Sequence, residues 1–303
     1  MPWVDCAGLI MKPPPFEYHD PKSVSEAIAI LRSHGNSKLL AGGQSLMPML
    51  NMRYVQPDHI VDLNKIDALS YITEENDVIR IGAMTRQREL EFSTVIQQRL
   101  PLMYEALLAV GHRQTRNRGT IGGSLCHLDP AAELPTVAMA YDAIVEVSGT
   151  DKAREISMAN FPAFYMTPAI EPDEIVTGLK FKPWPKGHGS AFVEFARRHG
   201  DFALASVAVL VEVASETICR ASITVGGLAH KPTRVLEAEY VLVTEGVNDK
   251  AFHKAAEACG AIDAIADIHG SKAYRQHVAK TLAFRAISAA YRRAVVFRTG
   301  RPA

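Results

Sequence analysis

The stretch Leu40-Ala41-Gly42-Gly43-Gln44-Ser45-Leu46-Met47-Pro48 has the pattern of a short strand that runs into a glycine turn. Two consecutive glycines let the backbone turn tightly and approach a ligand, because no Cβ stands in the way. Consecutive backbone N–H groups in such a turn, with a hydroxyl nearby, can surround a phosphate. Taken alone, the stretch predicts either a phosphate-binding turn or an ordinary glycine connection.

A second stretch of the same kind occurs later, at Gly119-Thr120-Ile121-Gly122-Gly123-Ser124. It also has an apolar residue, two glycines and a hydroxyl side chain in sequence. Two such turns in one domain could hold the two phosphates of a dinucleotide. The pair therefore favours dinucleotide binding over two unrelated connections.

Composition excludes several classes of protein. The chain has 303 residues, which is long for one domain, and 48% of them are hydrophobic, so a large core is possible. Its formal net charge is zero, which argues against non-specific nucleic-acid binding. No run is long and apolar enough to span a membrane.

The four cysteines are far apart and form no C-x-x-C pair, so they predict neither a disulfide framework nor a metal site. Free cysteines fit a reducing cytoplasm. Residues 1–11 lack the features of a signal peptide, and we interpret them as a leader outside the fold.

Hydrophobic spacing and breaker residues predict the helices and strands of the chain, with an α+β unit in its C-terminal part. Ser23 and Glu26 form a capping-box pattern before a helix that ends at Gly35. Together with the strands expected at 38–41 and 59–63, this helix predicts a compact β-α-β unit of the parallel type. Residues 112–118 are expected to form a basic loop, whose arginines either face solvent or hold the loop, a phosphate or a partner. Further strands are expected at 38–41, 59–63, 72, 78–82, 143–147, 175–181, 190–196, 202–213 and 218–225, and helices at 85–92, 101–110, 136–141, 248–259 and 271–296.

The breaker-rich loop 183–189 is the predicted domain boundary. The two strands that follow it are expected to form an antiparallel pair with one face covered. Between the second turn and the next helix, Asp129 and Glu133 are candidates for accepting hydrogen bonds from sugar or ribityl hydroxyls. Either residue could instead cap that helix. Cys126 is interpreted as a packing residue, and His127 has no partner at metal-ligand spacing.

Four motifs together resemble one family. They are Ala41 to Pro48, Thr120 to Ser124, Asp129-Pro130-Ala131-Ala132-Glu133-Leu134-Pro135, and Arg198-His199-Gly200-Asp201-Phe202-Ala203. In this order they are similar to the FAD-binding medium subunit of molybdenum hydroxylases, the carbon monoxide dehydrogenase and xanthine dehydrogenase type. The resemblance covers nearly the whole chain.

The resemblance implies an α+β fold with a two-subdomain, p-cresol methylhydroxylase-like FAD-binding domain and a small α+β C-terminal domain. The expected ranges are 12–187 for the first, with subdomains at 12–65 and 66–187, and 188–303 for the second. FAD would be bound non-covalently between the subdomains. Phe202 stands where relatives often carry tyrosine, and Gln44 where some have histidine. The implied FAD-binding residues are Leu40, Ala41, Gly42, Gly43, Gln44, Ser45, Leu46, Met47, Thr120, Ile121, Gly122, Gly123, Ser124, Asp129, Glu133, Val176 and Phe202.

The resemblance also implies partners. A large subunit would carry the molybdopterin, and a small subunit would carry two [2Fe–2S] clusters. The complex is expected to be a cytoplasmic dimer of heterotrimers. This chain would relay electrons from the clusters to an external acceptor, without a catalytic side chain or a metal site of its own. No cysteine set for an iron–sulfur cluster is present, which agrees with this division.

Other functions remain open at this point. A stand-alone flavin oxidase or dehydrogenase of the p-cresol methylhydroxylase-like class would be reduced directly by its substrate. A non-enzymatic nucleotide-binding assembly module would purify without flavin. A Rossmann protein would require G-x-G-x-x-G after a strand, and neither glycine stretch has that spacing.

Overall fold

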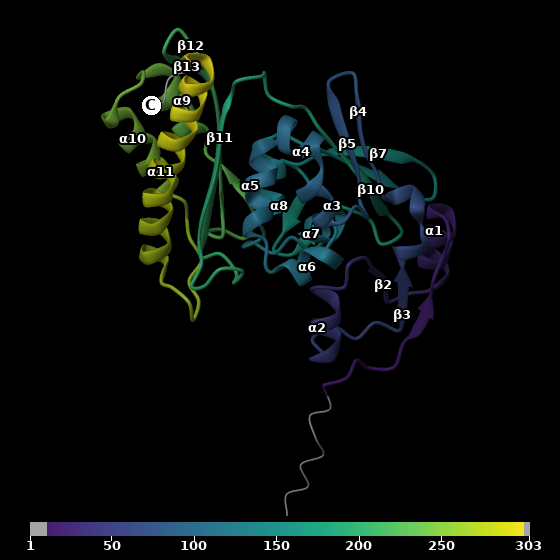
Figure 1. The fold of residues 1–303 in the computed structure, drawn as a ribbon. Coiled ribbons are helices and arrows are strands. Elements are labelled where there is room, and N and C mark those ends of the chain that lie inside the picture. The colour runs from purple at the N-terminus through teal and green to yellow at the C-terminus, as the bar shows by residue number, and fades with distance from the viewer. Residues whose placement is uncertain (1–10, 300–303) are drawn as a thin grey trace, which may run out of the picture.

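The computed structural model describes residues 11–299. The first ten residues of the predicted leader lie outside this range. The described chain forms three larger sheets and a small two-stranded one, with helices packed between and around the larger sheets (Figure 1). The predicted α+β fold class is confirmed by this architecture and by the structural matches described below.

The first sheet is parallel and has the strand order β1-β3-β2. It carries the predicted β-α-β unit. Helix α1 begins after Ser23, whose side chain accepts a hydrogen bond from the Glu26 N–H at 3.1 Å. Its apolar face packs on the sheet through Ala27 and Ile28 against Val61. The elements are β1 (Glu17–His19), α1 (Val24–Ser33), β2 (Ser37–Leu40), α2 (Leu46–Asn51) and β3 (His59–Asp62).

The second sheet has five antiparallel strands in the order β4-β5-β10-β6-β7. The helices that follow β5 and precede β6 pack beside it, and all of them except α6 contribute to its apolar core. Its strands are β4 (Ile72–Glu75), β5 (Val78–Gly82), β6 (Ile144–Ser148), β7 (Ala153–Ser157) and β10 (Ile175–Phe181). The helices are α3 (Gln87–Phe92), α4 (Thr94–Arg99), α5 (Pro101–Ala109), α6 (Arg113–Arg118), α7 (Ile121–His127) and α8 (Glu133–Ala140).

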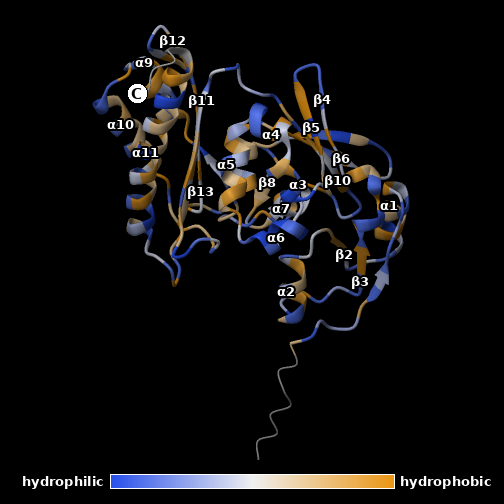
Figure 2. Cartoon of the chain, viewed as in Figure 1, coloured by the Kyte–Doolittle hydropathy of each residue, from blue (hydrophilic) through white to orange (hydrophobic). Residues whose placement is uncertain are grey.

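Two expectations for this region were wrong. The basic stretch that was expected to be a loop is helix α6, which Figure 2 shows as hydrophilic along its length. Arg116 fixes this polar helix to the rest of the domain. Its Nε donates to Glu91 Oε2 at 2.9 Å and its Nη1 donates to the Val110 carbonyl at 2.9 Å, both in a buried setting. The second glycine stretch is not a turn either, because it forms the first residues of helix α7.

The third sheet is antiparallel, with the order β11-β12-β13-β14. Helices α9, α10 and α11 cover one face, while α5 and α8 pack on the other (Figure 1). Val207 and Val209 of β12 belong to the core under α11, whereas Ala208 and Leu210 belong to the core shared with the second sheet. The elements are β11 (Gly189–Phe195), β12 (Ala205–Ala214), β13 (Thr217–Gly226), β14 (Thr233–Arg234), α9 (Leu236–Thr244), α10 (Asp249–Gly260) and α11 (Lys272–Thr299).

The expectation that one face of this third sheet is free was therefore wrong. A strand that is covered on both sides reads as a continuous apolar run, and β12 has that composition. Three short elements complete the described chain: two 3₁₀ turns at Leu63–Lys65 and Asp67–Leu69, and the small hairpin of β8 (Pro162–Phe164) with β9 (Thr167–Pro168). No helix in the described part of the chain is long and apolar enough to cross a membrane.

Candidate functional site

The first glycine stretch forms the predicted turn between β2 and α2. Gly43 has a φ of +73°, a conformation that side chains other than glycine rarely adopt. Within the described chain, no atom accepts a hydrogen bond from the backbone N–H groups of Gly42, Gly43, Gln44 or Ser45. The Ser45 hydroxyl is also free of a partner there. Four consecutive N–H groups at the start of a helix, with a hydroxyl beside them, have the donor chemistry of a diphosphate site.

The second glycine stretch uses its N–H groups differently. The N–H of Ile121 donates to Thr85, that of Gly122 to Ala83, and that of Gly123 to the Thr120 hydroxyl at 3.0 Å. These donors are therefore already satisfied inside the protein. Ser124 keeps a half-buried hydroxyl without a partner among the described residues. We infer that this stretch offers a ligand its surface and a hydroxyl rather than a row of main-chain donors.

The two glycine stretches touch each other. A Cβ on Gly42 would lie 2.2 Å from the Arg118 carbonyl oxygen, and a Cβ on Gly123 would lie 2.8 Å from Thr120 Oγ1 and 3.4 Å from Ala41 Cβ. The glycines are needed because the backbones approach so closely. A side chain on Gly123 would thus meet protein atoms of both glycine stretches first.

Two polar residues that the sequence did not reveal hold this contact together. Asn64, just after β3, donates from its side-chain amide to the Ala41 carbonyl at 3.0 Å. Arg86 donates to the Asn64 side-chain oxygen and to the Arg118 carbonyl. Burial, followed by the nearby Arg118 charge, lowers the pKa of Arg86. The Arg86 guanidinium thereby links Asn64, which holds Ala41 of the first glycine stretch, to Arg118 just before the second.

The acidic candidates lie after helix α7, which ends at Leu128 in a left-handed conformation with φ +48°. One oxygen of Asp129 accepts from the Ala131 N–H at 2.9 Å, so Asp129 orders the turn rather than capping α8. Glu133 is buried in the first turn of α8. Its carboxylate has no side-chain hydrogen bond within the described structure. Both residues keep a free oxygen that can accept from a ligand hydroxyl.

The last two candidates have opposite environments. Val176 is 4% exposed in β10 and belongs to the core of the second sheet. Phe202 is 76% exposed, in the loop between β11 and β12. This loop reaches the segment before α6, because a Cβ on Gly200 would lie 2.6 Å from the His112 ring. Phe202 is an aromatic side chain free to stack on a planar ligand.

Cys126 behaves as a packing residue. It lies in α7 and packs against the core of the second sheet, and burial raises the pKa of its thiol to about 12. A thiol with such a pKa stays protonated at neutral pH, so it is not a nucleophile. The neighbouring His127 belongs to no group of metal-ligating side chains within residues 11–299.

Two acids near the site, the buried Glu133 and the half-buried Glu194, make stability depend on pH. Burial raises the pKa of Glu133 to about 7 and that of Glu194 to about 8, and the charge of Glu133 adds to the shift of Glu194. An unfolded glutamate titrates near pH ~4.3. Between these values the folded state holds more protons than the unfolded state, so the free energy of unfolding falls as pH rises through this window.

We expect Glu194→Gln to reduce this fall. One oxygen of Glu194 is buried and has no hydrogen-bond partner among the described residues, so the neutral amide removes a charge that is costly above neutral pH. Urea unfolding at about pH 5 and about pH 9 measures the difference. The control is Glu237→Gln, since Glu237 is an exposed glutamate on α9. This variant should leave the difference in stability between the two pH values unchanged. If the free energy of unfolding depended equally on pH in Glu194→Gln and in the original chain, the raised pKa of Glu194 would be contradicted.

Two family models match the chain in succession. The model for the FAD binding domain in molybdopterin dehydrogenase matches residues 14–184, and the model for the CO dehydrogenase flavoprotein C-terminal domain matches residues 190–290. The chain belongs to this flavoprotein family. The cofactor of the family is FAD, and the predicted resemblance is confirmed.

Named relatives are similar in sequence to this flavoprotein over nearly its full length. It is 39% identical to the 6-hydroxypseudooxynicotine dehydrogenase complex subunit alpha of Paenarthrobacter nicotinovorans, over 94% of this chain and 97% of that one. It is 36% identical to the carbon monoxide dehydrogenase medium chain of Hydrogenophaga pseudoflava, over 93% and 99%. The relatives are subunits of dehydrogenases, and this chain is an oxidoreductase subunit.

Solved structures show the same fold. Carbon monoxide dehydrogenase from Hydrogenophaga pseudoflava superposes with a TM-score of 0.91 at 36% identity, covering 93% of this flavoprotein and 99% of that chain. Quinoline 2-oxidoreductase from Pseudomonas putida 86 gives a TM-score of 0.90 at 29% identity, with the same coverage.

Proposed function

We propose that this flavoprotein is the medium subunit of a molybdenum hydroxylase that takes electrons from [2Fe–2S] clusters of a partner subunit and delivers them to an external acceptor. FAD, when bound, supplies the redox chemistry, and the chain supplies binding and electrostatics. The observation that carries the proposal is the turn after β2, in a chain matched by the FAD-binding family model. Its four N–H groups have no acceptor among residues 11–299, and they suit a diphosphate.

The residues of this chain would divide the binding as follows. The N–H groups from Gly42 to Ser45 hold the diphosphate, and Leu46 and Met47 continue the backbone into α2 behind it. Ser124 adds a hydroxyl, while Thr120, Ile121, Gly122 and Gly123 form a surface close to the turn. Asp129 and Glu133 accept from sugar or ribityl hydroxyls. Phe202 lies against the flavin, and Val176 supports the site from the core.

The proposed domain limits follow the same division. The FAD-binding domain spans residues 12–187, with subdomains at 12–65 and 66–187, and the C-terminal domain spans residues 188–303. The three-stranded sheet lies wholly within the first subdomain, and the four-stranded sheet lies wholly after the boundary, which supports these limits.

The proposed partners are a large molybdopterin subunit and a small [2Fe–2S] subunit, assembled as a cytoplasmic dimer of heterotrimers. The carbon monoxide dehydrogenase relatives are named medium chains, and another relative is named a subunit of a dehydrogenase complex. Large apolar side chains exposed on this chain also support a partner surface, among them Ile268 at 91%, Tyr54 at 80% and Met52 at 73%.

Purification from the native host through a tag on this chain tests the proposal. We expect iron, molybdenum and FAD to copurify, and the mass of the complex to equal two copies of each of three subunits. The flavin of the isolated chain should not be reduced by the substrate of the complex. Direct reduction of the isolated chain by an organic substrate would instead establish a stand-alone dehydrogenase and overturn the proposal.

A further inference from the structure

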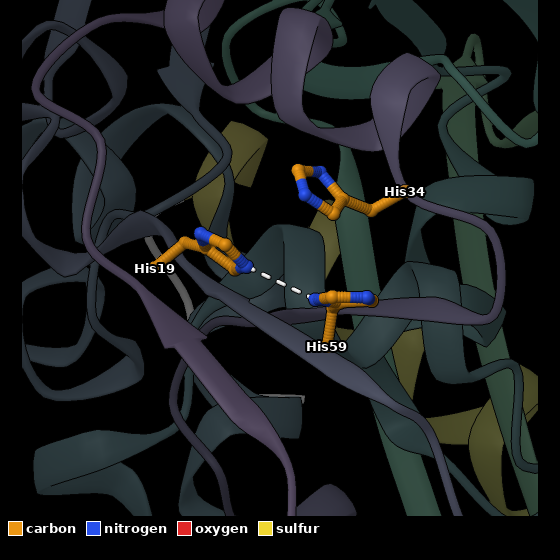
Figure 3. Close-up of side chains that lie close together, drawn as sticks. All are labelled: His19, His34 and His59. Atoms are coloured by element: carbon orange, nitrogen blue, oxygen red, sulfur yellow. Dashed lines mark hydrogen bonds between the residues drawn. The ribbon is translucent and has the colours of Figure 1, made fainter.

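Three histidines that are distant in the sequence meet at one end of the parallel sheet. His19 is the last residue of β1, His34 follows the end of α1, and His59 is the first residue of β3. All three are half-buried, and their rings converge on one point (Figure 3). The ring centroids are 4.4 Å apart for His34 and His59, and 5.1 and 5.4 Å from His19 to these two.

The ring nitrogens have spacings suited to a metal ion. His19 Nε2 and His59 Nδ1 are 3.2 Å apart, and one nitrogen of each of the three rings lies within 4.8 Å of the others. In a tetrahedral zinc site with Zn–N bonds of about 2.0–2.1 Å, two ligand nitrogens are about 3.3 Å apart. The first pair already has this separation, and His34 needs only a small ring movement to reach it.

The third ring is oriented by its own helix. His34 Nδ1 lies 3.1 Å from the Ile30 carbonyl oxygen, and 2.8 Å from the Ser33 hydroxyl. Because a carbonyl only accepts hydrogen bonds, Nδ1 carries the proton, which leaves the lone pair on Nε2. A hydrogen bond of this kind to the second ring nitrogen is typical of histidines that bind metals.

A carboxylate completes the set. Glu17 Oε2 lies 3.5 Å from His59 Nδ1, and the Glu17 side chain is 64% exposed, so it is free to move. Glu17 pairs with His59 in the sheet register, and both project from the same face as His19. A set of imidazoles and one carboxylate favours zinc and related transition ions over magnesium or calcium.

We propose that His19, His34 and His59 bind one divalent transition-metal ion of the zinc type, with Glu17 or water as the fourth ligand. The sequence predicted no metal site in this chain, because the three histidines lie far apart in it and form no closely spaced ligand motif. The ion would join β1, β3 and the end of α1. It would therefore brace the sheet from which the first glycine turn extends.

This site is separate from the candidate FAD site. His59 stands at the beginning of β3, whereas the glycine turn follows the opposite end of the neighbouring parallel strand β2. Three residues of strand separate the two ends, a length of about 10 Å. Metal binding and flavin retention can therefore be measured independently in the same sample.

Calorimetric titration of zinc chloride into the chelator-treated, FAD-loaded chain tests the proposal. We expect one ion per chain with a Kd of about 1 µM or tighter. His34→Gln and His59→Gln should each weaken zinc binding about tenfold or more, because each removes a ligand. His277→Gln, an exposed histidine of α11, is the matched control and should leave the Kd unchanged. Flavin absorbance and circular dichroism report whether the variants remain folded.

Cobalt(II) binding to the unaltered chain gives a second measurement that does not depend on variants. A tetrahedral site with nitrogen ligands should produce intense visible ligand-field bands that zinc abolishes by competition. A zinc Kd weaker than about 100 µM, an affinity unchanged in both His34→Gln and His59→Gln, or the absence of these cobalt bands would overturn the proposal.

Discussion

Gly43→Val is expected to lower the FAD content of the purified chain about tenfold or more, which corresponds to at least ~1.4 kcal/mol of binding free energy. Gly43 has a φ of +73°, and a residue with a Cβ pays roughly 1–2 kcal/mol in this region. The new side chain would also stand 3.2 Å from Met47 Cγ and 3.4 Å from Leu40 Cδ1. The turn must therefore change shape, and its four N–H groups no longer point at one ligand.

The ratio of flavin absorbance to protein concentration after gel filtration measures this effect. Gly35→Val is the matched control, because it lies in the same subdomain, has no positive φ, and its Cβ would meet nothing within 4 Å. The control should keep its flavin. If Gly43→Val also retained one flavin per chain, the diphosphate would have to bind elsewhere.

Arg275→Leu is expected to destabilise the folded chain by about 3–5 kcal/mol, the usual cost of breaking a buried charge network. Arg275 is only 4% exposed. Its Nη1 donates to the Leu204 carbonyl at 2.7 Å and the Gly227 carbonyl at 2.9 Å, and its Nη2 donates to Asp267 Oδ2 at 2.7 Å. The substitution leaves two carbonyls and a carboxylate without this donor.

Urea unfolding followed by circular dichroism measures this loss. Arg285→Leu, an exposed arginine on the same helix, is the control and should change stability by less than about 0.5 kcal/mol. The loss should also weaken flavin binding, because the Gly227 N–H donates to the Pro130 carbonyl beside Asp129. Equal stability of the two variants would show that the network contributes little.

Local patterns predicted much of the fold. The cap at Ser23, the hairpin of β4 and β5, strand β10 and the Asn248 cap of α10 all depend on neighbours in sequence, and all are present in the structure. The helical start at Gly122 was missed because two glycines usually indicate a turn. The structure explains the glycine, since a Cβ there would lie 2.6 Å from Ala83 Cβ.

The candidate site was only partly predictable from the sequence, because only part of it depends on residues that are neighbours in the chain. The turn at Gly42 and Gly43 is a local feature and could be read directly. Asn64 and Arg86 act through residues far away in the chain, and the three histidines converge only after β1, α1 and β3 have assembled. Contacts of this kind leave no periodic signal in a single sequence, so only the three-dimensional arrangement reveals them.

Strand β12 contributes alternate side chains to two separate cores, and this affects both the dissociation of fragments and the unfolding of the chain. Proteolytic cleavage in the loop before β11 would cut the backbone at the proposed domain limit without releasing either piece. Ala208 and Leu210 would still be locked against the preceding helices. The two fragments should therefore comigrate under native conditions and unfold in a single thermal transition. The regions matched by the two family models would then behave as one cooperative unit.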